Sequence, residues 1–177
     1  SWSRGLGDVY KRQGVNDTAS VNENATLTAS NASSNGVLAN DDDNAAYDSE
    51  SLAVTNISSN STGNSGNATQ GVLGTYGTLT VAADGTYTYV ANTAAAEALD
   101  AGDQVTDVFT YTVKDDDDVN SSDATLTITV TGVDDDPVGN NDAGAINEDK
   151  TLTVSAGSGV LSNDTDADAS ACLLYTS

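Results

Sequence analysis

Gly77–Val90 reads GTLTVAADGTYTYV and decides the fold class of this chain. Two runs that alternate apolar residues with threonine flank Asp84-Gly85, a dipeptide that suits the tight turn of a β-hairpin because glycine adopts positive φ at little cost. The same period-two alternation recurs in Asp107–Lys114 (DVFTYTVK) and in Ala124–Thr131 (ATLTITVT). Alternation of this kind predicts strands with one buried face.

The rest of the chain adds shorter elements to this pattern. Strands are predicted at Ala25–Ala29, Val37–Ala39 and Leu52–Ile57, and one or two helical turns at Thr93–Leu99. Ser58–Gly71 has no periodicity and is rich in Ser, Asn and Gly, which predicts a mobile surface insertion. Seven or so short strands with turn signals between them predict an all-β fold, an antiparallel Greek-key β-sandwich.

Two stretches of the chain repeat nearly the same sequence. NDTASVNENATLT and GVLANDDD in the first copy correspond to NDAGAINEDKTLT and GVLSNDTD in the second, so that Glu23 pairs with Glu148 and Asp41 with Asp164. A chain that starts the same unit again is typical of a tandem array. We therefore expect one complete repeat at 14–138 and the truncated start of the next at 139–171, too short to close a core of its own.

The two ends of the chain have a different origin in this interpretation. SRGLGDVYKRQ near the N-terminus and CLLYTS at the C-terminus correspond to the two translated orientations of one sequencing-adapter element. Residues 1–13 and 172–177 are therefore interpreted as adapter-derived artefacts on a segment of environmental DNA, and are excluded from fold reasoning. The alternative is a natural basic N-terminal arm.

The composition limits the classes of function. The formal charge is −22, and residues 14–171 hold 26 acidic side chains against only Lys114 and Lys150. Nucleic acid is excluded as a partner because its binding needs a basic face, and no apolar run is long enough to insert in a membrane. The chain has no histidine, so histidine-dependent catalysis is excluded, and a two-carboxylate glycosidase would need an aromatic sugar cleft. We expect a protein that is not an enzyme.

Thirteen aspartates fall in four clusters, at 41–43, 115–118, 134–136 and 164–168, and each cluster follows a predicted strand. Ca²⁺ binds six to eight oxygen ligands and accepts carboxylates, so clusters at strand ends predict calcium sites assembled from separate loops. Two alternatives stay open: the acids are solvated loop residues, or they reflect adaptation to high salt. Salt adaptation would spread acids over strand surfaces, which here carry mostly threonine.

The ordered set of motifs resembles the VCBS repeat, a cadherin-like bacterial repeat of very long secreted surface proteins. The resemblance rests on GTLTVAADGTYTYVAN, AEALDAGDQVTDVFTYTVKDDDD, ATLTITVTGVDDDPVGNND, NEDKTLT and GVLSNDTDAD, in that order along the chain. It implies a calcium-binding sandwich repeat that is exported by type I secretion to the cell surface or the extracellular space. Four aspartates follow the DVFTYTV strand where the family has a glycine-containing turn, which puts the ligands there in doubt.

The resemblance also implies a set of calcium ligands at the junctions between repeats. The junction after the complete repeat would use Glu23, Asp115, Asp117, Asp134 and Asp136, with Asn141, Asp142, Asp164 and Asp166 contributed by the next repeat. Neighbouring junctions would use the residues at equivalent positions, Asp41 and Asp43, and Glu148 and Asp149.

Two functions compete on this basis. The first is a non-catalytic, calcium-stabilised extender of a bacterial adhesin, whose partners are the neighbouring repeats of the same chain. The second is an adhesive module that itself binds a glycan, a host protein or a biofilm surface. An exposed aromatic patch on the Tyr87/Tyr89 face would favour the second, whereas core packing of these tyrosines is the expectation.

Overall fold

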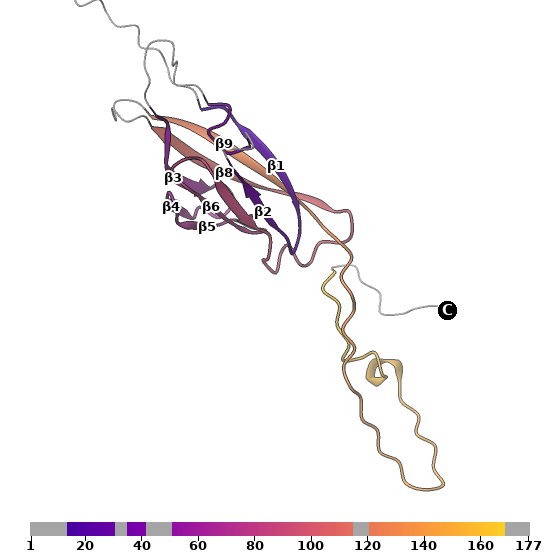
Figure 1. Cartoon of the computed structure of the whole chain (residues 1–177). Coiled ribbons are helices and arrows are strands. Elements are labelled where there is room, and N and C mark those ends of the chain that lie inside the picture. Colours follow the sequence, from indigo (N-terminus) through magenta and orange to yellow (C-terminus); the bar gives the residue numbers. More distant parts are fainter. Residues whose placement is uncertain (1–13, 31–34, 42–50, 115–120, 169–177) are drawn as a thin grey trace, which may run out of the picture.

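The computed structural model of the chain describes residues 14–30, 35–41, 51–114 and 121–168. These residues form nine strands and no α-helix, arranged as a sandwich of two sheets (Figure 1). The strands are β1 (Asp17–Asn22), β2 (Thr26–Ala29), β3 (Ala53–Ser59), β4 (Ser65–Asn67), β5 (Gly71–Leu73), β6 (Thr78–Val81), β7 (Tyr87–Val90), β8 (Gln104–Lys114) and β9 (Ser121–Thr131). The predicted all-β sandwich is therefore confirmed. The predicted adapter sequences lie outside the described residues. None of the described segments forms a helix with the length and hydropathy of a membrane span.

The two sheets have the orders β1-β9-β8-β3-β4 and β2-β7-β6-β5. Neighbouring strands are antiparallel, except that β1 runs parallel to β9. The β6–β7 pair is the predicted hairpin: Gly85 lies in its turn with φ +82°, and the Asp84 carboxylate accepts a hydrogen bond from the Thr86 N–H. The chain changes sheet between β1 and β2, at the end of the sandwich where β9 also ends.

The core lies between the sheets and follows the predicted alternation. Phe109, Tyr111 and Val113 of β8 are buried, as is every second residue of β9 from Ala124 to Val130. From the other sheet the ring of Tyr89 meets Phe109 edge-on, with 6.2 Å between ring centroids. The alternate positions of β8 and β9 are largely threonine and face outward. Alternation thus identified the buried face of both long strands correctly.

The same inward face of β8 carries a buried carboxylate. Asp107 is fully buried and accepts four hydrogen bonds: from the backbone N–H groups of Thr75 (2.9 Å), Tyr76 (2.9 Å) and Gly77 (3.2 Å), and from the Tyr89 hydroxyl (2.7 Å). A buried carboxylate is tolerated when its oxygens are hydrogen-bonded in this way. Asp107 therefore fixes the turn that leads into β6 and joins the two sheets.

Several local predictions are wrong. Val37–Ala39 forms turns instead of a strand, because Val37 bonds to Gly85 outside either sheet. The segment Thr93–Leu99, predicted as one or two helical turns, has one helix-type hydrogen bond, from the Glu97 N–H to the Thr93 carbonyl (3.0 Å), and otherwise forms tighter turns that bury Ala96 and Leu99. The predicted insertion Ser58–Gly71 contributes the end of β3, then β4 and the start of β5, because hydrogen bonds between neighbouring strands and the burial of Val72 offset a weak local pattern.

Residues 133–168 leave the sandwich where β9 ends and return to it as a long loop (Figure 1). The two arms of the loop meet at Val138 and Thr165, which form a pair of backbone hydrogen bonds of 2.7 and 3.0 Å. Ile146, Leu152, Val154, Val160 and Leu161 are exposed on the loop, between 42% and 69%, whereas Val37, the partner of Val160 in the first copy, is fully buried. The side chains of a core are present here without the sheets that would cover them.

The paired sequences adopt matching local backbone conformations. Asn24 and Asp149, which follow the paired glutamates, have φ of 57° and 59°. The Asp41 carboxylate accepts a hydrogen bond from the Val15 N–H (2.6 Å), and its counterpart Asp164 accepts one from the Asn140 N–H (2.7 Å). The repetition in sequence is therefore also a repetition of hydrogen bonds.

Candidate metal site

Glu23 lies directly after β1, at the end of the sandwich from which the linker departs. Its N–H donates to the Thr131 carbonyl (2.9 Å), and the N–H of Asn24 donates to the Ala91 carbonyl (2.7 Å). Positive φ at Asn24 turns the chain sharply between the two sheets, which asparagine tolerates better than most residues. The Glu23 side chain is thereby held inside the end of the sandwich and is only 2% exposed.

The linker that follows β9 supplies the next carboxylate. Gly132 exchanges backbone hydrogen bonds with Gly102 (3.0 Å) and Asp103 (2.9 Å), and a Cβ at this glycine would overlap the Asp100 carbonyl. The next N–H, that of Val133, donates to Glu23 Oε1 at 2.6 Å. These contacts fix the path of the linker and place Asp135 beside Glu23.

The returning arm of the loop supplies the third carboxylate. Asp168 Oδ2 accepts a hydrogen bond from the Asp135 N–H (3.2 Å), and the Asp168 N–H donates to Asp166 Oδ1 (3.1 Å). Asp166 thus positions Asp168, and Asp168 positions the linker. Glu23, Asp135 and Asp168 come from a domain, its linker and the segment that follows, yet one carboxylate oxygen of each lies within 4.8 Å of the others.

Each of these carboxylates has one buried oxygen without a hydrogen-bond partner among the residues that the structure describes. These oxygens are Glu23 Oε2, Asp135 Oδ2 and Asp168 Oδ1. Burial raises the pKa of Glu23, and the negative charges of Asp135, Asp168 and Glu97 raise it further, while the hydrogen bond from Val133 acts in the opposite direction. Three carboxylates this close together, each with a buried oxygen unpaired within the described chain, are unfavourable unless a proton or a cation joins them.

The donor set fits a hard divalent cation. All three groups are carboxylates, and oxygen ligands of this kind are what Ca²⁺ and Mg²⁺ take, whereas softer metals favour thiolate and imidazole. The chain has no histidine to offer. Glu23, Asp135 and Asp168 would hold the ion through their carboxylate oxygens, and Ca²⁺ would complete its coordination with further oxygens, since it takes six to eight.

The structure places the predicted ligands in several environments. Of the predicted set only Glu23 lies in the three-carboxylate cluster, whereas Asp134 and Asp136 are exposed on either side of Asp135. Asp164 and Asp166 are half-buried and serve as hydrogen-bond acceptors for the linker arm and for Asp168. Asn141, Asp142, Glu148 and Asp149 are exposed on the long loop, and Asp43, Asp115 and Asp117 lie outside the described residues.

Asp41 lies at the opposite end of β1 from Glu23. Its Oδ2 is buried and has no hydrogen-bond partner in the described ranges of the chain, and burial raises the pKa of this carboxyl to about 6. Beside it the Tyr111 hydroxyl donates to Asp17 Oδ2 (2.7 Å) and also lies close to the carbonyl oxygens of Val37 (2.9 Å) and Val15 (3.1 Å). Two carboxylates and a tyrosine thus close the far end of the core.

Sequence reasoning did not select Asp135 or Asp168. Asp135 lies in the acidic run 134–136, but a linker outside a sheet gives no rule for which of three adjacent aspartates points inward. In the internal repeat Asp43 pairs with Asp166, so the residue that pairs with Asp168 is Ala45. Asp168 therefore has no acidic counterpart in the first copy. For Asp135 the available signal was its place in the acidic run 134–136, and for Asp168 it was its nearness in sequence to Asp166.

The tyrosines follow the core expectation. Tyr89 is fully buried and Tyr87 is 5% exposed, so the described part of β7 offers no aromatic surface patch for stacking a ligand.

The comparisons with known proteins agree with the architecture. A family model of the bacterial cadherin-like domain matches residues 13–132. This match covers the sandwich from β1 to β9 and ends at Gly132, immediately before the linker. No curated protein matches the chain.

Proposed function

Because the chain belongs to the bacterial cadherin-like domain family, we propose that it is a calcium-stabilised repeat module of a secreted or cell-surface bacterial adhesin, acting as an extender. Domains of this family are generally non-catalytic, and the proposed role is mechanical. The narrower assignment to the VCBS repeat and export by type I secretion belong to the same proposal.

One observation carries the calcium part of this proposal. Glu23 in the domain, Asp135 in the linker and Asp168 in the following segment bring one carboxylate oxygen each within 4.8 Å of the others. Each of the three also has a buried oxygen with no hydrogen-bond partner among the described residues. A cation among them would neutralise their repulsion and join three parts of the chain. Calcium would therefore fix the direction in which the chain leaves the sandwich.

The size of the effect follows from mass action. Extracellular modules bind Ca²⁺ with dissociation constants of about 0.1–1 mM. At about 0.1 mM affinity, calcium at about 1–10 mM would stabilise the bound state by roughly 1.4–2.7 kcal/mol. In a compartment with little free calcium the junction would stay loose, which suits export of an unfolded chain.

Thermal melting of the full chain tests the proposal. Calcium at millimolar concentration should raise Tm relative to EDTA, with a smaller effect of equal Mg²⁺ and none from NaCl at the same ionic strength. Asp168→Asn should lose this response, whereas Asp142→Asn, an exposed aspartate on the same loop, should keep it. Stabilisation by molar NaCl without preference for calcium would contradict the proposal and favour salt adaptation.

A further inference from the structure

Residues 142–154 repeat the segment that forms β1 and β2, yet their apolar side chains face solvent. Ile146 and Leu152 are 52% and 49% exposed. Their counterparts in the first copy, Val21 and Leu27, pack against the core of the sandwich. The chain therefore carries two copies of this pair of segments, one docked on the sandwich and one with its apolar side chains in water.

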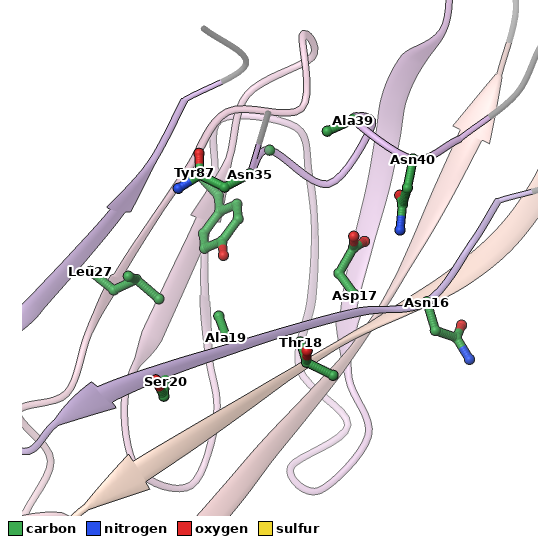
Figure 2. A pocket seen from close by; sticks show the side chains of 11 residues that line it. Asn16, Asp17, Thr18, Ala19, Ser20, Leu27, Asn35, Ala39, Asn40 and Tyr87 are labelled. Atoms are coloured by element: carbon green, nitrogen blue, oxygen red, sulfur yellow. The ribbon is translucent and has the colours of Figure 1, made fainter. Parts of the chain in front are cut away.

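The place that β1 and β2 occupy lies at the edges of the two sheets. β1 is an edge strand and pairs with β9, and β2 is the edge strand of the other sheet and pairs with β7. Figure 2 shows Ala19 rising from β1 toward the side where Tyr87 lies, whereas Ser20 points away. A cavity of about 500 Å³ remains beside Ala19, Leu27 and Tyr87. β1 and β2 thus close the edge of the sandwich without filling it.

The second copy has the local shape that this place requires. The turn between β1 and β2 needs a positive φ at Asn24 (57°), and Asp149 has the same conformation (59°). Gly144 and Leu152 already lie side by side, since a Cβ at Gly144 would be 3.0 Å from Leu152 Cδ2. Their counterparts in β1 and β2 line one cavity. Residues 142–154 therefore hold the two arms of the segment next to each other before any docking.

Replacement of β1 and β2 by the second copy would bury more apolar surface than it exposes. The inward replacements are Ile146 for Val21, Leu152 for Leu27, Val154 for Ala29 and Gly144 for Ala19. The carbon atoms gained at two of these positions outnumber the methyl group lost at Gly144, and burial of apolar surface favours association. Ala29 is only 1% exposed, so the larger Val154 has the tightest fit. Because overpacking has a cost, we expect the replacement to be partial.

The linker decides which sandwich receives the segment. In the place of β1, residues 142–147 would run parallel to β9, the strand that precedes them in the chain. Parallel neighbours need a connection of about a dozen residues or more, and residues 132–141 fall short of this length. The Val133 N–H is also held by Glu23 at the end of the sandwich. The sandwich of a second molecule sets no such limit.

We propose that residues 142–154 of one chain bind to the sandwich of a second copy of this chain, in the place of its β1 and β2 and in the same register along β9 and β7. This interaction goes beyond the extender role, because it joins two molecules side by side through their repeats. It does not require calcium, so its test is made in EDTA.

Disulfide trapping between two variants tests the proposal. In the proposed register Ala145 takes the place of Ser20, whose partner on β9 is Thr129. Chains with Ala145→Cys are mixed with chains with Thr129→Cys at about 1 mM, because the β1 of each chain competes at an effective concentration in the millimolar range. Cys172→Ser in every chain removes the native thiol. The mixture should form a disulfide-linked dimer of the two different chains.

Two controls test the register and the site. Thr125→Cys lies on the same outward face of β9, about 13 Å from Thr129. It should give less than about a tenth as much linked dimer with Ala145→Cys, since a disulfide needs Cα atoms within about 7 Å. Ser20→Cys combined with Thr129→Cys in one chain fixes β1 to β9 by an internal disulfide, and this locked chain should not accept the segment.

Sedimentation equilibrium of the full chain measures the association without added cysteines. The average mass should rise above that of the monomer near 1 mM protein, in about 0.3 M NaCl, which screens the repulsion between chains of formal charge −22. Ile146→Ser should weaken association about tenfold or more, because it removes an apolar side chain from the interface. Ala145→Ser, which supplies the residue that β1 has at this position, should keep it.

Four results would overturn the proposal. The first is an unaltered chain that stays monomeric at about 1 mM. The second is equal linking by Thr125→Cys and Thr129→Cys, and the third is a locked chain that associates as strongly as the unaltered one. The fourth is Ala145→Cys chains that link mainly to one another, since the loops of two molecules would then pair with each other instead of with a sandwich.

Discussion

The buried carboxylate of Asp107 gives the sharpest test of how the sandwich is held together. Asp107→Asn keeps the size of the side chain but replaces one acceptor oxygen by an NH₂ group. If the amide oxygen keeps the position of Oδ2, near Tyr76, Gly77 and Tyr89, the NH₂ group faces the Thr75 N–H at the position of Oδ1. Two donors then oppose each other in a fully buried site.

The magnitude follows from these contacts. Hydrogen bonds to a charged group contribute about 1.5–3 kcal/mol and neutral ones about 0.5–1.5 kcal/mol, so each of the three bonds that remain weakens by about 1 kcal/mol. The unpaired donors add about 1–3 kcal/mol. We expect Asp107→Asn to lower the free energy of unfolding by about 3–5 kcal/mol, because the losses are not fully additive.

Urea unfolding monitored by tyrosine fluorescence and far-UV circular dichroism measures this free energy, and the corresponding fall in Tm is about 10–20 °C. Tyr89→Phe removes one of the four donors and should cost about 1–2 kcal/mol. Asp103→Asn, an exposed aspartate just before β8, is the matched control and should change stability by less than about 0.5 kcal/mol. An Asp107→Asn variant as stable as Asp103→Asn would refute the view that this carboxylate organises the turn before β6.

Three further outcomes are expected. In EDTA, the contribution of Asp41 to stability should be greatest below pH 4 and should fall by about 2 kcal/mol as the pH rises to about 6. The reason is that burial raises the pKa of the folded carboxyl to about 6, so the folded state holds the proton more tightly than the unfolded state does. Urea unfolding of the unaltered chain and of Asp41→Asn across this range measures the effect, and a difference in unfolding free energy between the two that is constant with pH contradicts it. Tyr111→Phe should cost about 1–3 kcal/mol, since it leaves Asp17 and two carbonyl groups without their shared hydroxyl, and Tyr87→Phe is the control in the same denaturation assay. Gly132→Ala should displace the start of the linker, because its Cβ would overlap the Asp100 carbonyl. It should lower both the free energy of unfolding, by about 1–3 kcal/mol, and the calcium affinity. Gly157→Ala is the control and should change neither, since a Cβ at Gly157 would have no atom within 4 Å.

Period-two alternation was a reliable guide where a strand is long and buried on one face. It placed Phe109 and Tyr111 of β8 in the core and predicted the β6–β7 hairpin from Asp84-Gly85. It did not predict that Asp107 is buried. An aspartate at an inward position contradicts the alternation unless one knows which turn donates hydrogen bonds to its carboxylate. The carboxylate needs Thr75–Gly77, which come from another strand end 30 or more positions away.

Short strands were harder to predict because their pairing depends on neighbours. β1 escaped detection: its outward residues are polar and its inward residues, such as Ala19 and Val21, are only partly buried. β4 and β5 form in a segment of Ser, Asn and Gly, where backbone hydrogen bonds to β3 and β6 replace local preference. Tertiary pairing overrides weak propensity in both cases.

The candidate metal site, too, could be predicted only in part from the sequence. The resemblance to the VCBS repeat named Glu23 among the junction ligands, and the internal repeat pairs it with Glu148. The composition of the linker indicated that it was acidic, but the choice between Asp134, Asp135 and Asp136 depends on how Val133 and Asp168 bond to it. These contacts join positions more than 30 and more than 100 residues apart, which no local pattern encodes.

Calorimetric titration of the full chain with calcium tests the central claim most directly. Glu23→Gln, Asp135→Asn and Asp168→Asn each remove one charge from the three-carboxylate cluster, and Asp134→Asn and Asp136→Asn remove the same charge from exposed positions beside it. We predict that the first three variants each lose one millimolar or tighter calcium site that the last two retain. Equal binding by all five variants, or no calcium binding by the unaltered chain at millimolar concentration, would contradict the account.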